Sequence, residues 1–237
     1  MPKNVLVTGF EPFGGDRVNP SELVVRAFEA RVVAERPIQA VILPVQTRTL
    51  RVELDEAIAK YRPDVIICCT QGAGRTAVAV ERVAVNLMDF EKPDNVGVAR
   101  KNEQIVRGGP EAQLSTLPVD KIVEAWHANG VPGYVSNASG TEIANQALYE
   151  ALTLVAQATP PILVGLVQFP YLPAQALDHG PERTPSMSLD LMKKALEVAI
   201  EAVVPWVEAR PERPAAAKPA NAGANLWIPR GIKEVER

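Results

Sequence analysis

Cysteine is scarce in this sequence. The 237 residues contain two cysteines, Cys68 and Cys69, which are adjacent. A disulfide between neighbouring residues is strained, and two cysteines cannot supply the four ligands of a structural zinc site. The sequence therefore excludes a disulfide scaffold and a zinc module. Inert packing in a buried strand is the interpretation that we favour for both thiols.

Histidine is equally rare, since His127 and His179 are the only two. This scarcity limits any chemistry that needs an imidazole near neutral pH. We expect His127 at the end of a helix and His179 in a loop beside Asp178. Both are interpreted as ordinary surface or helix-terminal residues rather than as catalytic bases.

An excess of positive charge and long hydrophobic runs are also missing. With 25 basic and 28 acidic residues the net charge is -3 and the pI about 5.6. The chain therefore has no excess of positive charge that could neutralise a phosphate backbone or an anionic membrane. The longest apolar runs, such as residues 65–69 and 162–167, are too short to span a bilayer. Residues 1–4 do not open a cleavable hydrophobic segment. We expect no nucleic-acid partner, no membrane partner and a cytoplasmic protein.

Short β-branched runs alternate with amphipathic stretches along most of the chain. This alternation is typical of strands joined by crossover helices, and 47% apolar residues suffice for a sizeable core. The prediction is an α/β fold: a three-layer α/β/α sandwich with a mixed, mostly parallel twisted sheet of the phosphorylase/hydrolase-like kind. The expected strands cover residues 3–9, 38–45, 64–70, 76–86, 133–137 and 162–168. The expected helices begin at Pro20 after an Asn19 cap and at Thr47, itself a cap, and cover 118–128, 141–158 and 186–208.

Two segments fall outside this pattern. Residues 88–118 carry turn signals and predict a long excursion with short extended pieces. We divide the chain into an α/β domain at 1–208 and a Pro/Ala-rich tail at 209–237, because the tail has no periodicity and cannot bury a core of its own. It ends in an apolar cluster at 226–229, so we expect it to dock on the domain or on a neighbouring subunit, and Trp227 is a candidate to plug the active site.

Two glycine-rich loops resemble phosphate-binding motifs incompletely. Gly9–Asp16 has P-loop glycine spacing, but Gly15 and Asp16 stand where Lys and Ser or Thr belong. Gly72–Ala77 matches the G-x-G-x-x-A dinucleotide pattern. The residues after Ala77 alternate like a strand, whereas a helix N-terminus should hold the pyrophosphate. We therefore disfavour dinucleotide binding.

Phe10 and Phe13 lie in the first of these loops, at the sheet edge where open α/β folds bind ligands. They are two of only five phenylalanines, and they suggest either a flat apolar clamp or rings that pack into the core. The residues leave both alternatives open. Asn19 is by default a helix cap.

A strand, a tight turn and a helix start succeed one another at 133–141, an arrangement that elsewhere exposes a nucleophile. The candidate hydroxyls are Ser136, Ser139 and Thr141, but no histidine has an obvious claim to act as their base. Glu81 lies in an otherwise apolar strand beside Arg82. A carboxylate buried there must be paired or functional, and a structural ion pair is the interpretation that we favour from the residue alone.

Taken together, these segments resemble pyrrolidone-carboxylate peptidase, also called pyroglutamyl-peptidase type I, a cysteine peptidase that removes N-terminal pyroglutamate. The resemblance covers about the first 205 residues. It implies an α/β/α sandwich, usually a tetramer, that acts without metal or cofactor. The matching segments are Val7–Gly15, Asn19–Pro20, Leu43–Val45, Gly74–Arg75, Glu81–Asn86, Pro93–Asn95, Ser115–Pro118, Val135–Asn137, Pro170–Pro173 and Pro185–Ser188.

The family's catalytic residues are a cysteine at a helix start, a histidine at a strand end and a glutamate that orients the histidine. Carried over by position, the glutamate is Glu81, but Ala144 stands at the cysteine position and Gln168 at the histidine position. Alanine cannot form an acyl-enzyme, and a carboxamide is not a useful base near pH 7. The resemblance therefore predicts a divergent member that lacks cysteine-peptidase catalysis.

Other positions also depart from the family. Glu91 stands where the family usually has arginine, Glu142 replaces an aromatic residue, and Cys68–Thr70 replaces His-Val-Gly. The recognition half is better preserved. The resemblance implies that Phe10 and Phe13 sandwich the pyrrolidone ring, that Asn19 contacts its carbonyl, and that the backbone near Gln71 binds its amide.

These observations leave three hypotheses. The first is a catalytically silent protein that binds N-terminal pyroglutamyl peptides or a similar small lactam. The second is a hydrolase with an altered mechanism, in which Glu81 or Glu91 serves water or a nucleophile such as Ser136, Ser139 or Cys69. The third is a subunit that assembles with an active paralogue. We expect a homo-oligomer, dimer or tetramer, with neither metal nor cofactor.

Overall fold

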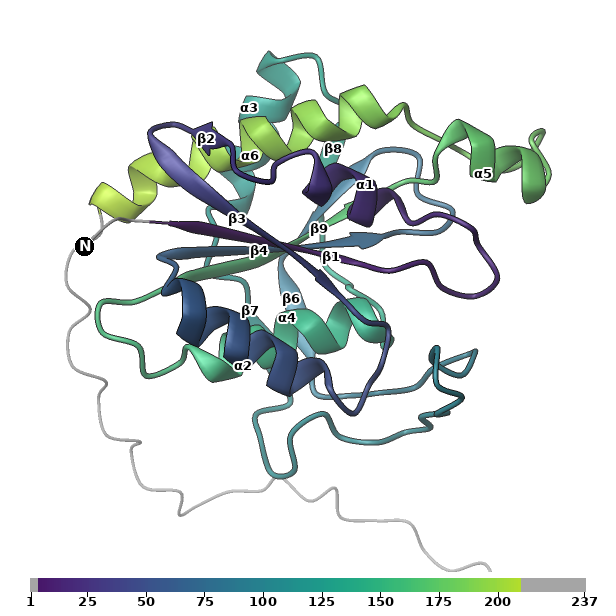
Figure 1. Cartoon of the computed structure of the whole chain (residues 1–237), viewed down its shortest axis with the longest axis horizontal. Helices are drawn as coiled ribbons and strands as arrows, with labels where there is room; N and C mark the ends of the chain where they lie inside the picture. The colour runs from purple at the N-terminus through teal and green to yellow at the C-terminus, as the bar shows by residue number, and fades with distance from the viewer. Residues whose placement is uncertain (1–3, 210–237) are drawn as a thin grey trace, which may run out of the picture.

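A seven-stranded sheet runs through the middle of the computed structural model, which describes residues 4–209 (Figure 1). The strand order is β2-β3-β1-β4-β9-β5-β8. Strands β3, β1, β4 and β9 run parallel, β5 is antiparallel to β9, and β8 is parallel to β5. The predicted mixed, mostly parallel sheet is confirmed. Its strands are β1 (Val5–Phe10), β2 (Val32–Val33), β3 (Arg36–Leu43), β4 (Val65–Gln71), β5 (Val78–Glu81), β8 (Gly133–Ser136) and β9 (Leu163–Phe169).

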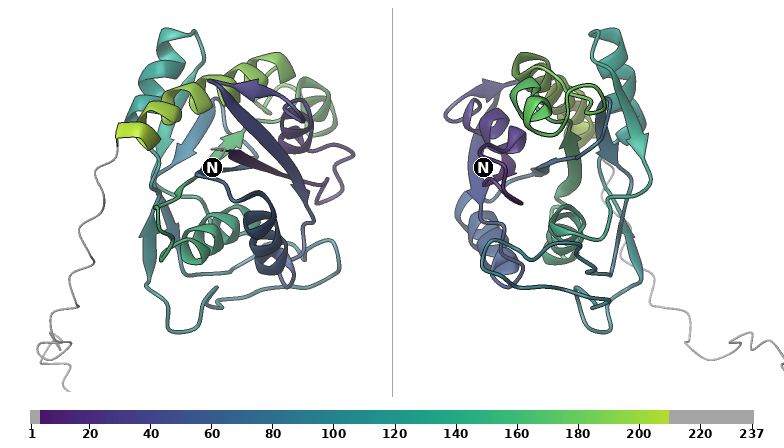
Figure 2. Two further views of the ribbon diagram at one scale, coloured as in Figure 1. Left: turned by 60° about the vertical axis from the view of Figure 1, so that its left-hand side comes forward. Right: turned by 90° about the vertical axis from the view of Figure 1, so that its right-hand side faces the viewer.

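Helices cover both faces of this sheet, which gives the predicted three layers (Figures 1 and 2). Their apolar sides pack on two separate buried clusters, one on each face. The indole N–H of Trp126 donates to the Ala195 carbonyl oxygen at 2.7 Å and fixes two helices of one layer to each other. One layer contains α1 (Pro20–Arg26), α3 (Val119–Ala128) and α6 (Leu189–Ala209), the other α2 (Leu50–Tyr61) and α4 (Ile143–Leu154); the short α5 (Pro173–Asp178) comes after β9.

The central strands are buried on both faces. Every residue of β1 and β9 is buried, and so is β4 except for its last residue, Gln71. Such continuous apolar runs are typical of parallel strands covered on both sides. Cys68 and Cys69 lie in β4 with no exposed surface, and burial raises the pKa of both thiols. This environment confirms the interpretation of inert packing.

Asn19 caps α1, as predicted. Its Oδ1 accepts from the backbone N–H of Ser21 at 3.0 Å, and Pro20 occupies the first helical position. The helix packs so closely on β1 that a Cβ at Gly9 would lie 2.6 Å from the carbonyl oxygen of Ser21. Glycine is therefore required at the point where β1 passes under α1.

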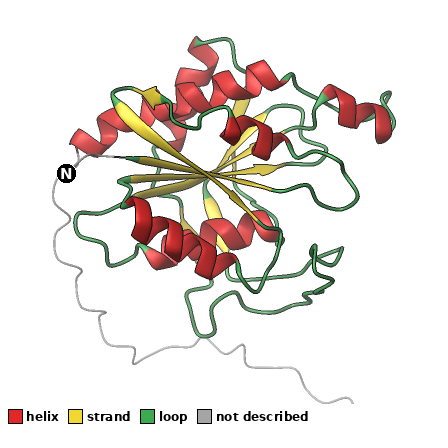
Figure 3. Ribbon diagram, in the orientation of Figure 1, coloured by secondary structure: helices red, strands yellow, loops and turns green. Residues whose placement is uncertain are grey.

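The prediction of a single strand at residues 76–86 is wrong. The chain forms β5 in the main sheet, leaves it at Arg82, and forms β6 (Val83–Val85), which pairs with β7 (Ala112–Leu114) in a separate two-stranded sheet. The alternating pattern continues across the break because each half faces a buried surface of its own. The long excursion before β7 is confirmed and lies on the α2 and α4 side (Figure 3).

Two other local predictions need correction, and two short elements were not predicted. Thr47 does not cap α2, because its hydroxyl and backbone N–H both donate to Oδ2 of Asp94, at 3.0 and 2.8 Å. Helix α4 begins at Ile143 and ends at Leu154, inside the expected 141–158. Strand β2 and helix α5 were not predicted, because two and six residues are too few to show a period.

The expected docking of the tail and the position of Trp227 fall outside the described residues, and the division at 208/209 stays a prediction.

Candidate functional site

A cavity of about 950 Å³ opens where β1, β4 and β9 reach their carboxyl ends. The loop after β1, the loop from β4 to β5, residues 89–92 and the start of α4 form its walls. Ligands of open α/β folds bind at this edge of the sheet. The cavity is therefore the candidate active site.

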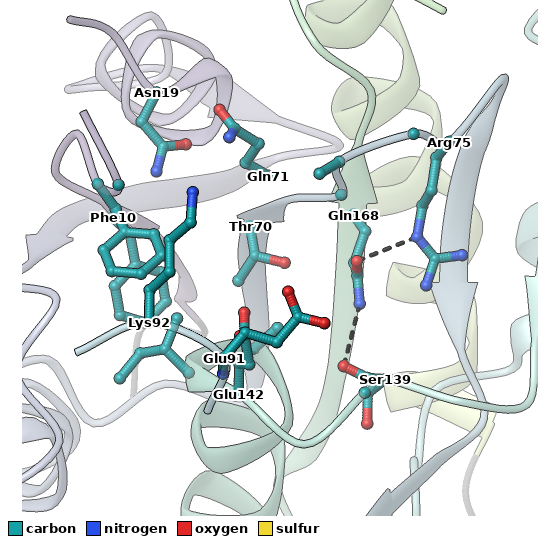
Figure 4. Close-up of a pocket in the computed structure, with 18 of the residues that line it drawn as sticks. Phe10, Asn19, Thr70, Gln71, Arg75, Glu91, Lys92, Ser139, Glu142 and Gln168 are labelled. Atoms are coloured by element: carbon teal, nitrogen blue, oxygen red, sulfur yellow. Dashed lines mark hydrogen bonds between the residues drawn. The ribbon is translucent and has the colours of Figure 1, made fainter. Parts of the chain in front are cut away.

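The structure brings the three expected catalytic positions close together. Ala144, in the first turn of α4, and Gln168, in β9, line the cavity. Glu81, the last residue of β5, is completely buried and is linked to Gln168 through Arg75. Nη2 of Arg75 donates to Oε1 of Glu81 at 2.7 Å. Its Nε donates to Oε1 of Gln168 at 3.0 Å (Figure 4).

Arg75 lines the cavity and pairs with Glu81, a role that the sequence did not indicate. The sequence places Arg82 beside Glu81, but neighbouring residues of a strand point to opposite faces, and Arg82 instead pairs with Asp120 at 2.9 Å. A Cβ at Gly72 would lie 2.5 Å from Cδ of Arg75, so this glycine leaves the space that the arginine occupies. The available signal was a lone arginine in a loop at the binding edge, close to a carboxylate that needed a partner.

The environment of Glu81 has two opposing effects on its charge. Burial raises the pKa of Glu81 above its usual value, while the nearby hydroxyl of Ser136, the charge of Arg75 and the nearby backbone of Ala138 counteract the rise. Oε1 is held by Arg75, whereas Oε2 has no hydrogen-bond partner among the described residues. The expected ion pair is present, and the second oxygen of the carboxylate is buried.

Phe10 and Phe13 form an apolar wall of the cavity. Phe10 is 1% exposed and belongs to the buried cluster beneath α2 and α4, and Phe13 packs against the same cluster. The two alternatives that the sequence left open are thus compatible, because the rings pack on the core and line the cavity at once.

The polar groups of Asn19 are largely engaged within the protein. Oδ1 accepts from the backbone N–H and the hydroxyl of Ser21, at 3.0 and 2.8 Å, and Nδ2 donates to the carbonyl oxygen of Glu11 at 3.0 Å. One amide hydrogen is left. Asn19 lines the cavity, so it can donate a single hydrogen bond to a ligand while it caps α1.

Gln71 is held by its neighbours in a similar way. Its Nε2 donates to Oδ2 of Asp16 at 2.9 Å, and its Oε1 accepts from Gln175 at 2.8 Å. Asp16 also contacts Nε2 of His179 at 2.7 Å, and that imidazole stacks on Tyr171 with ring centroids 4.7 Å apart. His179 therefore lies at the cavity, a position that the sequence did not indicate.

The other histidine is remote from the cavity. Nε2 of His127 lies 2.8 Å from the carbonyl oxygen of Gly133, and His127 is exposed near the end of α3. It is not among the residues that line the cavity. The interpretation of His127 as a helix-terminal residue is confirmed.

Three charged side chains at the cavity have no ion-pair partner within 4.0 Å among the described residues: Glu91, Lys92 and Glu142. Oε1 of Glu142 accepts from the backbone N–H of Glu91 at 3.1 Å, so the two acidic residues are neighbours. The side chain of Lys92 extends away from them, toward Asn19 and Gln71 (Figure 4).

The candidate hydroxyl nucleophiles are all hydrogen-bonded to the main chain. Ser136, Ser139 and Thr141 donate to backbone carbonyl oxygens at 3.3, 3.0 and 2.8 Å respectively. Cys69 lies inside β4, where burial raises its pKa well above the usual value. None of these four groups lies against a histidine in the described structure, and Ser136 lies beside the Glu81 carboxylate, whose Oε1 is held by Arg75.

The glycine pattern at residues 72–77 leads into β5, as its alternation predicted. No helix N-terminus comes after it, so the main feature of a dinucleotide site is missing. Within residues 4–209, no three His, Cys, Asp or Glu side chains gather closely enough to hold a metal ion. None of the described helices is both long enough and apolar enough to cross a membrane.

Comparison with known proteins gives consistent matches. The family described as pyroglutamyl peptidase matches residues 3–205. The chain is 42% identical over 202 residues to a pyrrolidone-carboxylate peptidase of Bacillus velezensis, covering 84% of this chain and 91% of the relative. It is 36% identical over 203 residues to that of Pyrococcus furiosus, covering 83% and 98%. The solved structure of a mutant pyrrolidone carboxyl peptidase from the same organism superposes with a TM-score of 0.83 at 35% identity, covering 86% and 99%.

Proposed function

Because this chain belongs to the pyroglutamyl peptidase family, we propose that it binds N-terminal pyroglutamyl groups without cleaving them. The observation that carries this proposal is the pair of side chains at Ala144 and Gln168, which face the cavity at the positions where the family has its nucleophile and its base. A methyl group cannot attack a carbonyl carbon, and a carboxamide cannot take a proton near pH 7. Loss of such a pair typically costs on the order of 10⁶ in turnover.

The binding half of the cavity supports retained recognition. Phe10 and Phe13 supply an apolar wall, and Asn19 keeps one amide hydrogen for a ligand oxygen. A neutral lactam suits such a site because it needs flat apolar contacts and few hydrogen bonds. Pyroglutamyl peptides are therefore the proposed ligands.

The alternative is an active hydrolase that uses Glu81 and a different nucleophile. The contacts favour it less, because the candidate hydroxyls donate to the main chain and Oε1 of Glu81 is bound by Arg75. If this alternative holds, the wild type will turn over a chromogenic pyroglutamyl amide and Glu81→Gln will abolish that turnover. We expect the wild type to show no turnover.

We further propose that the chain acts in the cytoplasm as a homo-oligomer, dimer or tetramer, without metal or cofactor. The family resemblance supports this assembly. Light scattering on the purified chain tests the oligomeric state, and co-purification from the native cell tests whether an active paralogue joins the assembly.

Titration calorimetry with pyroglutamyl amide tests the binding proposal. We expect saturable heat at millimolar concentration or below, and its loss in Phe13→Ala. The matched control is Val52→Ala, which also shortens an apolar side chain but on the exposed surface of α2. A wild-type protein that gives no heat would overturn retained recognition.

A further inference from the structure

Glu91 and Glu142 mark a second binding element next to the proposed pyroglutamyl pocket. We propose that these two carboxylates select pyroglutamyl peptides whose second residue is positively charged. The proposal rests on the proposed function, since it assigns a specificity to the same site. It adds a ligand class, basic pyroglutamyl peptides, and the residues that recognise it.

The position of the two carboxylates is set by α4. Glu142 directly precedes the helix and lies two residues before Ala144, and its Oε1 accepts from the backbone N–H of Glu91. If the ligand binds as the family resemblance implies, the bond after its pyroglutamyl group faces Ala144. The second residue of the peptide then lies beside Glu91 and Glu142.

The cations of the cavity do not neutralise this pair. Arg75 is bound to Glu81 at 2.7 Å, and Lys101 is bound to Asp89 at 2.6 Å. The imidazole of His179 contacts Asp16 instead.

Lys92 is a further cation at the cavity, and it points away from Glu91 and Glu142 (Figure 4). Its ammonium extends toward Asn19 and Gln71 and lies more than 4.0 Å from both acidic residues (Figure 4). A Cβ at Gly14 would lie 4.0 Å from this ammonium, which places Lys92 at the pyrrolidone end of the cavity. The carboxylates of two neighbouring residues, Glu91 and Glu142, are therefore left without an ion-pair partner among the described residues at the α4 end.

A polar group on the cavity wall independently indicates a ligand. Thr70 lines the cavity, is 2% exposed, and its hydroxyl has no hydrogen-bond partner among the described residues. A buried hydroxyl without a partner is costly unless something else satisfies it. The relatives implied by the resemblance have glycine at this position, so this hydroxyl, like Glu91 and Glu142, is a departure from the family that changes what the cavity can bind.

Electrostatics sets the expected size of the preference. Glu91 and Glu142 each carry a carboxylate without an ion-pair partner among the described residues, and a ligand cation placed near both gains charge-assisted hydrogen bonds. Glu91 is exposed and Glu142 half-buried, so solvent and salt screen the interaction. We expect about tenfold tighter binding of a basic ligand than of a neutral one.

The test is calorimetry of the full chain with three probes: the amides of pyroglutamyl-lysine, pyroglutamyl-leucine and pyroglutamyl-glutamate. The expected order of affinity is lysine, leucine, glutamate, with about tenfold between the first two at low salt. The difference should shrink at high salt, because the Debye length falls. Equal affinity for all three probes would overturn this inference and leave the proposed function standing, whereas no binding of any probe would overturn the proposed function itself.

Substitutions show whether the two carboxylates cause the preference. The double variant Glu91→Gln and Glu142→Gln should bind all three probes alike, with an affinity near that of the wild type for the leucine probe. The control Glu124→Gln removes an exposed carboxylate on α3 that pairs with Lys121, and it should keep the full preference. Retained binding of the leucine probe shows that the double variant is folded. A preference for lysine that survives in it would contradict the proposal.

Discussion

Ala144 and Gln168 line the cavity. The Glu81–Arg75 pair, which would support catalysis by a cysteine and a histidine at these two positions, is still present. Oε2 of Glu81 has no hydrogen-bond partner among the described residues, and Arg75 fixes the other oxygen. The loss of catalysis that we propose is therefore local to two side chains. Around them, the expected catalytic positions keep the arrangement of strand ends and helix start that the family resemblance implies.

Restoring both side chains should restore cleavage. The double variant Ala144→Cys and Gln168→His supplies a thiol with a base, and we expect cleavage of a chromogenic pyroglutamyl amide at least about 10²-fold above background. Adding Glu91→Arg should raise it further, since it removes a negative charge that opposes the thiolate. Ala144→Cys alone is the control and should stay inactive. A double variant that binds the substrate but does not cleave it would show that more than these two residues is lost.

Arg75 and Glu81 form a pair whose value for stability can be measured. Arg75→Met leaves a completely buried carboxylate without its counter-charge, which we expect to lower the free energy of unfolding at pH 7 by roughly 3 kcal/mol. Urea denaturation monitored by circular dichroism measures the change. In the double variant Arg75→Met and Glu81→Gln the loss should be more than half recovered, because no charge is left to desolvate. An unchanged unfolding midpoint in Arg75→Met would contradict this assignment.

At the residue scale, the sequence predicted which side chains matter better than it predicted their partners. One carboxylate in an apolar strand was enough to show that Glu81 needed a partner. The identity of Arg75 was not predictable, because no local period fixes a loop residue six positions away relative to Glu81. For the same reason the place of His179 at the cavity, beside Asp16, was not predictable.

Between α2 and α4 lies a second buried carboxyl group, Glu150. Burial raises the pKa of Glu150 to about 7, while a hydrogen bond from Gln146 and the charge of Arg51 counteract the rise. Nε2 of Gln146 donates to Glu150 at 3.1 Å, but Oε1 of Gln146 and Oε2 of Glu150 have no partner among the described residues. Glu150, at the contact of these two helices, therefore favours the folded state more when its carboxyl group is protonated.

The stability of the protein should depend on pH through Glu150. Its pKa is higher in the folded state than the usual value of 4.5, so its favourable contribution is fully present below about pH 4.5 and is lost as the pH rises through about 7. Glu150→Gln keeps the shape, carries no charge and can donate to Gln146. We expect its free energy of unfolding, measured by urea denaturation, to exceed that of the wild type by up to about 3 kcal/mol at pH 8. Near pH 4.5 this difference should disappear. A variant less stable than the wild type at pH 8 would refute the assignment.

The contact of β1 with α1 also makes a sharp prediction. Gly9→Ala places a methyl group 2.6 Å from the backbone oxygen of Ser21, where no flexible side chain can give way. We expect a loss of about 2–3 kcal/mol in the free energy of unfolding. Gly15→Ala, where a Cβ would meet nothing within 4 Å but φ is +95°, is the comparison for pure backbone strain, and we expect it to lose less, roughly 1–2 kcal/mol. Equal stability of Gly9→Ala and wild type would show that the two elements can separate without cost.

At the element scale, long periodic segments were predictable and short or divided ones were not. Strand β4 was recognised because all of its first six residues are buried and apolar or nearly so. Residues 76–86 were not divided correctly, because β5 and β6 keep one alternating pattern while they belong to different sheets. Thr47 looked like a cap, but Asp94, 47 residues away, binds it more completely than a helix end would.

On the scale of the whole molecule, the layered architecture was predictable from the alternation of strands and helices. The antiparallel pairing of β5 with β9 was not, because local sequence does not specify the direction of a neighbour. The structure and the relatives agree on the fold over most of the chain, with a TM-score of 0.83 to the Pyrococcus furiosus structure. The functional difference that we propose rests on side chains around one cavity, within a shared arrangement of elements.

The measurement that tests the central claim most directly is a cleavage assay run beside a binding assay on the same preparation. Purified protein is incubated with pyroglutamyl-lysine amide, and mass spectrometry detects any free pyroglutamate, with the Bacillus velezensis relative as the comparison enzyme. We predict saturable binding and no release above the uncatalysed background. Release of pyroglutamate at a rate near that of the relative would contradict the account, because Ala144 and Gln168 could then not be the residues that decide the chemistry.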